Sequence, residues 1–89
     1  MNPIPKKITP VDLKRDGVYF KILKSGKIKT RKIVEFYRNE RYDVSCKDCV
    51  RFTENGKKER IWYSGEYVAE YFHSSVLAFC CWADGVVEP

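Results

Sequence analysis

From Val18 onward, apolar residues recur at every second position, and this period is typical of β-strands. Lys24-Ser25-Gly26 fits a three-residue hairpin loop, with Gly26 at the position that requires a positive φ. That loop sets Ile22 opposite Ile28, so the apolar side chains of both strands share one face. The spacing therefore predicts an antiparallel hairpin that begins at Val18.

Two further turn signals extend this pattern into a four-stranded antiparallel meander. One is the loop 39–41, and the other is the sequence Glu54-Asn55-Gly56-Lys57, in which Asn-Gly is the strongest short hairpin signal. The predicted pairs are Phe36 with Val44, Val34 with Cys46, and Val50 with Ile61. In each of these pairs an apolar residue faces an apolar residue.

The ends of the chain complete the expected fold. Thr9-Pro10 favours a short helical turn before the first strand. Ser64 can cap a short helix through about Phe72, although a strand over 65–72 also fits, and the apolar run 76–82 reads as a buried strand. We expect a mainly β fold with one short helix before the last strand. It would be a small SH3-like barrel or a strongly bent antiparallel meander sheet of about five strands.

Length and composition bound the class of protein. Eighty-nine residues, 44% of them hydrophobic, predict one globular domain over residues 1–89, with residues 1–8 as a flexible N-terminal arm. The longest apolar run, Val76 to Ala83, is shorter than the roughly 20 residues of a membrane helix. The first residues lack the apolar stretch of a signal peptide, so we expect a cytoplasmic protein with no membrane partner.

Charge is distributed unevenly along the chain. Residues 1–32 contain ten Lys and Arg against two acids, a net charge of +8, whereas residues 66–89 contain four acids and no Lys or Arg. Such asymmetry suggests that the basic end faces a polyanion. It also permits head-to-tail association of copies, and otherwise it is ordinary solvated surface charge.

The first hairpin is the most distinctive candidate site. Its register pairs Tyr19 with Arg31, Lys21 with Lys29 and Leu23 with Lys27 on a face predicted to point outward. Like charges directly opposite each other destabilise a sheet, so an anion is expected there, with Tyr19 as a stacking platform. Lysines that protect a strand edge are the alternative. The predicted nucleic-acid or partner-binding residues are Tyr19, Lys21, Lys24, Lys27, Lys29, Arg31, Arg38 and Arg41.

Four cysteines raise the question of a metal site. Cys46, Cys49, Cys80 and Cys81 could supply the four thiolate ligands of a tetrahedral zinc ion, which makes a small zinc-binding module one alternative. Adjacent cysteines on a strand point to opposite faces, however, so Cys80 and Cys81 converge poorly on one ion. We therefore expect Cys46 and one or both of Cys80 and Cys81 to be buried as small hydrophobic residues, with no metal and no cofactor.

The carboxy-terminal third points to a protein partner instead. It is acidic and aromatic and lacks Lys, as many protein-binding patches do, and Glu66, Tyr67, Glu70 and Tyr71 form the predicted second partner surface. The single His73 and the absence of a glycine-rich phosphate loop give no sign of an enzyme.

Two functions follow from these features. The first is a non-enzymatic protein that binds nucleic acid or a nucleoprotein complex through the basic hairpin. The second is a phage or mobile-element inhibitor or adaptor, anti-CRISPR-like in size and type, that binds a host defence protein through aromatic and charged patches.

Overall fold

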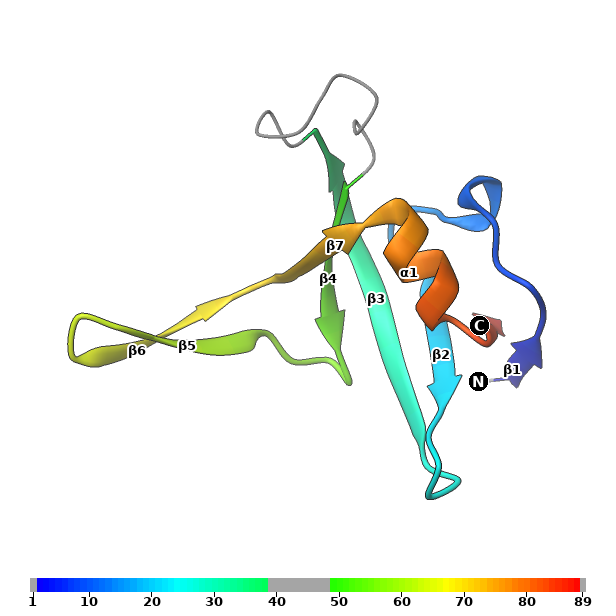
Figure 1. The fold of residues 1–89 in the computed structure, drawn as a ribbon, viewed down its shortest axis with the longest axis horizontal. Helices are drawn as coiled ribbons and strands as arrows, with labels where there is room; N and C mark the ends of the chain where they lie inside the picture. The colour runs from blue at the N-terminus through cyan, green and yellow to red at the C-terminus, as the bar shows by residue number, and fades with distance from the viewer. Residues whose placement is uncertain (1, 39–48, 89) are drawn as a thin grey trace.

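A computed structural model describes residues 2–38 and 49–88, and within them the fold is mainly β with one short helix before the last strand, as predicted (Figure 1). The elements are β1 (Asn2–Pro5), the 3-10 turn η1 (Pro10–Asp12), β2 (Val18–Ile22), β3 (Ile28–Tyr37), β4 (Cys49–Glu54), β5 (Glu59–Tyr63), β6 (Glu66–Glu70), β7 (Phe72–Ser75), α1 (Val76–Trp82) and β8 (Gly85–Glu88).

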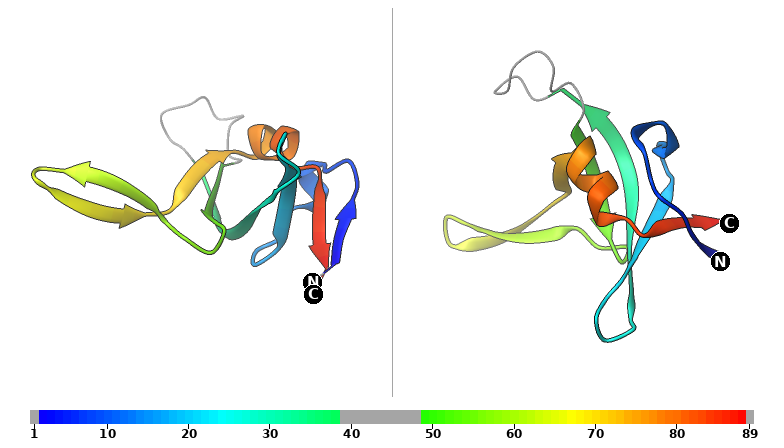
Figure 2. Two further views of the ribbon diagram at one scale, coloured as in Figure 1. Left: turned by 90° about the horizontal axis from the view of Figure 1, so that it is seen from below. Right: turned by 45° about the vertical axis from the view of Figure 1, so that its right-hand side comes forward.

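Six of the strands form one antiparallel sheet in the order β1-β8-β2-β3-β4-β7, and β5 and β6 form a separate two-stranded sheet. Strands β1 and β7 lie at the two ends of this order, so the described sheet is open. Figures 1 and 2 show α1 packed on one face of the sheet, while β5 and β6 extend away from it. Of the two expected architectures, the antiparallel sheet is the one that this arrangement matches, and within it β2, β3 and β4 are in the predicted meander order.

The core lies between α1 and the sheet. Phe79 of α1 is fully buried, and its ring meets Tyr19 of β2 and Phe52 of β4 edge-on at centroid distances of 5.4 and 5.2 Å. Ile33 of β3 and Val50 of β4 are also fully buried. Burial of these side chains, each contributing about 1.5–3 kcal/mol, fixes the helix against the sheet.

The first hairpin has the predicted register. Ile22 lies opposite Ile28 and Lys21 opposite Lys29, and Gly26 has a φ of 85°. The backbone N–H of Leu23 donates to Lys27 O at 2.8 Å and closes the loop. The loop length and the apolar pattern agree here, so local signals were sufficient.

The third turn forms as predicted, but the hairpin expected beyond it does not. Asn55 and Gly56 both have positive φ, and Glu54 bridges to Lys57. The predicted pair of Val50 with Ile61 is nevertheless wrong. Val50 lies opposite Phe36 on one side and Ser74 on the other, so β4 has no free edge for β5.

The second predicted turn, 39–41, lies outside the described residues, as do Val44 and Cys46. Phe36 pairs with Val50 of β4 rather than with Val44, and Val34 falls where the β3–β4 register shifts. The predicted pairs of this hairpin are therefore replaced by pairs with a later strand.

The helix and the strand of the last third are exchanged relative to the principal prediction. Residues 64–72, expected as a helix, contain β6 and the start of β7, and residues 76–82, expected as a strand, form α1. The side chain of Ser75 caps α1 by accepting from the Ala78 N–H at 3.1 Å. Val76 and Phe79 are its buried positions. A short continuous apolar run fits a buried strand and a buried helix equally well, which explains the error.

The amino-terminal segment is part of the fold, in place of the flexible arm expected over residues 1–8. Asn2–Pro5 form β1 and pair with β8, and Ile8 is buried in the core. The predicted turn at Thr9-Pro10 is present as η1, where the Thr9 N–H and hydroxyl both donate to the Asp12 carboxylate at 2.8 and 2.9 Å.

Candidate functional site

Two hairpins leave the body of the sheet and carry seven of the twelve predicted site residues (Figure 1). The first, here the basic tip, comprises residues 21–29 at the end of β2 and β3 and contains four lysines and no acid. The second, here the arm, comprises residues 59–70 of β5 and β6 and contains three glutamates and one arginine. The two hairpins therefore have net charges of opposite sign, +4 and −2.

Tyr19, predicted to stack on a ligand at the surface, is instead 1% exposed in the core. Its hydroxyl donates to Asp12 O at 2.7 Å and accepts from the Lys14 N–H at 2.8 Å. Burial raises the pKa of the Tyr19 phenol. The face that was expected to point outward at this end of the hairpin thus faces α1, and Tyr19 holds the segment after η1 to β2.

Arg31 is also engaged within the protein. Its guanidinium bonds to Glu54 at 2.9 Å and lies over the rings of Trp82 and Phe52 at 3.9 and 4.4 Å. Burial lowers the pKa of Arg31, and the nearby Glu54 carboxylate opposes that effect. Glu54 also pairs with Lys29 at 2.9 Å, so two of the predicted binding cations share one carboxylate within the protein.

The remaining lysines of the basic tip are differently placed. Lys24 and Lys27 are exposed and Lys21 is half-buried, and among the described residues these three have no ion pair. Ile22, Leu23 and Ile28 are exposed beside them. Arg38 is exposed just after β3, at the far end of that strand, and Arg41 lies outside the described residues. The basic tip therefore carries lysines and aliphatic side chains without the predicted aromatic ring.

The register of the arm sorts its side chains onto two faces. Trp62 lies opposite Tyr67 and Arg60 opposite Ala69, and these four residues share one face, here the aromatic face. The intervening pairs belong to the other face, here the acidic face, which holds all three glutamates of the arm. Its members are Glu59, Ile61, Tyr63, Glu66, Val68 and Glu70. The predicted second partner surface is thereby divided between two faces.

The aromatic face is ordered by contacts among its own side chains. The Trp62 and Tyr67 rings meet edge-on at 4.9 Å, and the Arg60 guanidinium lies 4.2 Å from the centre of the Tyr67 ring. Tyr71, half-buried, continues this face and lies under the Lys58 ammonium at 4.4 Å. Tyr67 and Tyr71 therefore share a face as predicted, because a spacing of four is also even along a strand.

These contacts leave most of the aromatic surface open. Trp62 and Tyr67 of the aromatic face are 61% and 59% exposed, and Tyr63 of the acidic face is 65% exposed. Interaction surfaces are recognised by exposed apolar groups of this kind, so the arm is the candidate functional site.

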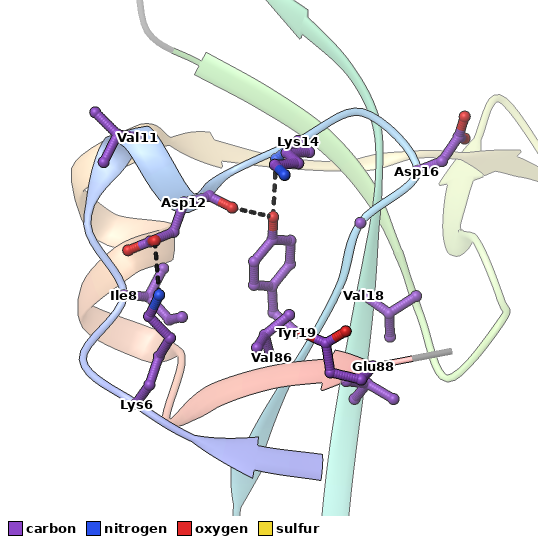
Figure 3. Close-up of a pocket in the computed structure, with 12 residues that line it drawn as sticks. Lys6, Ile8, Val11, Asp12, Lys14, Asp16, Val18, Tyr19, Val86 and Glu88 are labelled. Atoms are coloured by element: carbon purple, nitrogen blue, oxygen red, sulfur yellow. Dashed lines mark hydrogen bonds and ion pairs between the residues drawn. The ribbon is translucent and has the colours of Figure 1, made fainter. Parts of the chain in front are cut away.

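A cavity of about 610 Å³ lies on the opposite side of the molecule, between the segment after β1 and strands β2 and β8 (Figure 3). Three of its polar side chains are bonded within the protein: the Lys6 ammonium pairs with Asp12 at 2.9 Å, and the Tyr19 hydroxyl bonds to the backbone as described above. Hydrogen bonds from Thr9 and the Lys6 ammonium lower the pKa of Asp12 to about 2. The cavity wall is thus a structural network that fastens the amino-terminal segment.

The cysteines do not form a metal centre in the part of the chain that the structure describes. Cys49 is buried, Cys80 is half-buried with a thiol pKa raised by burial, and Cys81 is exposed. No group of three His, Cys, Asp or Glu side chains lies together as metal ligands would in residues 2–38 and 49–88. Cys46, the remaining member of the predicted set, lies outside those ranges.

Comparison with known proteins adds no assignment: the chain matches no protein-family model, no curated protein and no solved structure. In residues 2–38 and 49–88, no helix combines the length and the apolar character needed to cross a membrane.

The predicted second partner surface does not include Trp62 and Tyr63, although both are among the most exposed aromatic residues of the arm. The signal that could have found them is Ser64-Gly65. Ser64 and Gly65 have φ values of 48° and 91°, the pattern of a two-residue hairpin turn. Treating Ser64 as a helix cap concealed the alternation on either side of this turn.

Proposed function

We propose that this chain is a non-enzymatic binding protein that docks on a partner protein through the arm. The observation that carries this proposal is the group of exposed aromatic side chains, Trp62, Tyr63 and Tyr67, on a hairpin that extends from the sheet. Trp and Tyr are the residues most often responsible for interface affinity, because they bury a large area at a small cost in side-chain entropy.

The charge of the arm favours a protein over a nucleic acid as the partner. Its net charge of −2 opposes a phosphate backbone, and its one arginine already lies over Tyr67. An inhibitor or adaptor of a host protein would act in this way, by covering a functional surface of its partner.

The test is capture of partner proteins from nuclease-treated lysate of the cells that make this protein. The wild-type chain is compared with the Trp62→Ala/Tyr67→Ala variant, and Leu77→Ala is the matched control because Leu77 is 69% exposed on α1. Loss of one hot-spot aromatic costs about 2 kcal/mol or more, so we expect at least about 30-fold weaker capture by the arm variant and unchanged capture by the control. Equal capture by all three chains would exclude the arm as the docking surface.

Binding of a polyanion by the basic tip is a second candidate function. It is favoured by Lys21, Lys24 and Lys27, which have no ion pair among the described residues. Lys24→Glu/Lys27→Glu should then weaken nucleic-acid binding, and the wild-type affinity should fall with added salt in proportion to the number of phosphate contacts. Salt-independent binding, or none, would remove this candidate.

A further inference from the structure

Strands β6 and β7, here together the returning strand, have one edge that no described strand covers. Strands β6 and β7 are separated only by Tyr71, so residues 66–75 run as one nearly continuous strand, visible as such in Figures 1 and 2. Between the pairs Phe52–Phe72 and Glu59–Glu70, this strand advances by two residues while the strand opposite advances by seven. The extra residues form the Glu54–Lys57 turn, so β4–β5 and β6–β7 are the two sides of one interrupted hairpin.

That returning strand is paired along one side only. Among the described residues, β7 is the last strand of the six-stranded sheet, and β6 has β5 as its single neighbour. The opposite end of the sheet differs, because two of the four residues of β1, Pro3 and Pro5, lack an N–H and block the addition of a strand. Residues 66–75 contain no proline, lysine or arginine to protect them.

The turn at Ser64-Gly65 determines which backbone groups face outward. Residues that flank a two-residue hairpin turn exchange two hydrogen bonds, as Glu54 and Lys57 do at 2.9 and 2.8 Å around the equivalent Asn-Gly turn. Bonded and non-bonded pairs then alternate along the arm from Tyr63–Glu66. The N–H and C=O groups of Tyr67 and Ala69 therefore point away from β5, toward the open edge.

We infer that an extended segment of the partner adds to this edge as a third strand of the arm, an inference that rests on the proposed function. A two-stranded hairpin alone is marginally stable in water, and a further strand would supply its missing neighbour. A strand laid along residues 66–75 would also join the two sheets, because it would pair with β6 and β7 together.

The chemistry of the added strand follows from the residues that it would face. Glu66, Val68 and Glu70 are every second residue of β6 and share one face, in the order acidic, apolar, acidic. The complementary partner strand therefore carries a Lys or Arg, an apolar residue and a second Lys or Arg at every second position. A second copy of the chain does not fit this pattern, because its own edge would bring two glutamates and no basic residue to the pairing. The occupant is therefore a basic extended segment of another protein.

The test uses a fluorescent synthetic decapeptide. Lysine, valine and lysine occupy three successive alternate positions, and threonine occupies the others. The peptide is titrated against the wild-type chain, Ala69→Pro and Ala69→Thr, and binding is followed by anisotropy. Ala69→Pro removes an N–H that points to the open edge and no bond to β5, whereas Ala69→Thr retains that N–H. We expect about tenfold or greater weakening in the proline variant and less than about twofold change in the threonine variant.

A second measurement covers the case in which Ala69→Pro disturbs the arm. Two versions of the same peptide are titrated against the wild-type chain. In each version every second backbone amide nitrogen is methylated, and the two versions differ in which of the two sets carries the methyl groups. Strand addition requires one set to abolish binding and the other to leave it intact. Equal binding of both sets, no binding of the unmethylated peptide, or a dimer of the free chain that Ala69→Pro dissociates would each overturn the inference.

The failures of the two proposals are distinguishable. If Trp62→Ala/Tyr67→Ala loses the partner while both Ala69 variants bind the peptide equally, the arm remains the docking surface and strand addition is wrong. If the arm variant retains the partner, the proposed function is wrong whatever the peptide shows.

Discussion

The basic tip and the arm are both hairpins that leave the sheet, but they are anchored differently. The strands of the basic tip continue into the sheet, where Tyr19 and Phe20 of β2 are 1% exposed. The arm has no buried residue along its length; Ile61 and Val68 are only half-buried. A hairpin whose strands continue into a core obtains its stability there, whereas the arm must rely on its own cross-strand contacts. Its aromatic residues are therefore open to serve another purpose.

Removing one large side chain from each hairpin should give the largest contrast. Phe20→Ala should lower the free energy of unfolding by about 3–5 kcal/mol, because it empties a fully buried site. Trp62→Ala should lower it by less than about 1 kcal/mol, since Trp62 is 61% exposed. Urea denaturation followed by circular dichroism measures both. Similar losses in the two variants would mean that the arm is part of the cooperative core.

Replacing one glycine in the sheet and one in the arm should sharpen the comparison. A Cβ on Gly85 would overlap Ile4 O and lie 2.7 Å from the Phe20 ring, so Gly85→Ala must push β1 away from β8. We expect a loss of about 1–3 kcal/mol in the global free energy of unfolding. At Gly65 an added Cβ meets nothing within 4 Å, and the only cost is the φ of 91°.

Gly65→Ala should therefore act locally. We expect a strain of about 1–2 kcal/mol, which appears as faster amide exchange in the arm with little change in exchange of the sheet. Faster exchange throughout the sheet would contradict the separation of the two regions.

The same difference explains how much of the fold could be predicted. At the basic tip, the loop Lys24-Ser25-Gly26 and the apolar pair Ile22–Ile28 specify one register, and both are local signals. The Asn55-Gly56 turn was likewise predicted from a dipeptide. The pairing of the strands beyond this turn could not be predicted in the same way. The edge of β4 that β5 would need is occupied by β7, a strand about 20 residues later.

The candidate site was predictable only in part for a related reason. Alternation placed Tyr19 and Arg31 together on one face, and they do lie opposite each other. Which face points inward depends on where α1 packs, and the run 76–82 gave no periodicity that identified it as a helix. Tyr67 and Tyr71 kept their shared face because their spacing is even, which satisfies a strand as well as one helical turn.

A smaller effect should come from the Tyr19 hydroxyl, which bonds the segment after η1 to β2, the strand that leads into the basic tip. Tyr19→Phe keeps the ring against Phe79 and leaves the Lys14 N–H without its 2.8 Å acceptor. We expect a loss of about 1–2 kcal/mol in the free energy of unfolding. Tyr67→Phe is the matched control in the arm: Tyr67 is 59% exposed, and we expect a change within about 0.5 kcal/mol. If the two variants are equally stable, the Tyr19 hydroxyl does not fasten the segment after η1.

The smallest predicted effect is the loss of stability in acid that comes from the Asp12 carboxyl of η1. Hydrogen bonds from Thr9 and Lys6 lower the pKa of Asp12 to about 2 from 3.8, so the folded protein binds this proton less readily than the unfolded chain. Its contribution to stability is then fully present above about pH 4 and is lost as the pH falls toward 2. Urea midpoints measured from pH 5 to pH 2 for the wild-type chain and for Asp12→Asn isolate this carboxyl, because subtracting the two curves cancels the other acids. The difference should shrink as the pH falls, since protonated Asp12 and Asn both lack the charge that holds the Lys6 ammonium. A difference that stays constant across this range would show that the ionisation of Asp12 does not stabilise the amino-terminal segment.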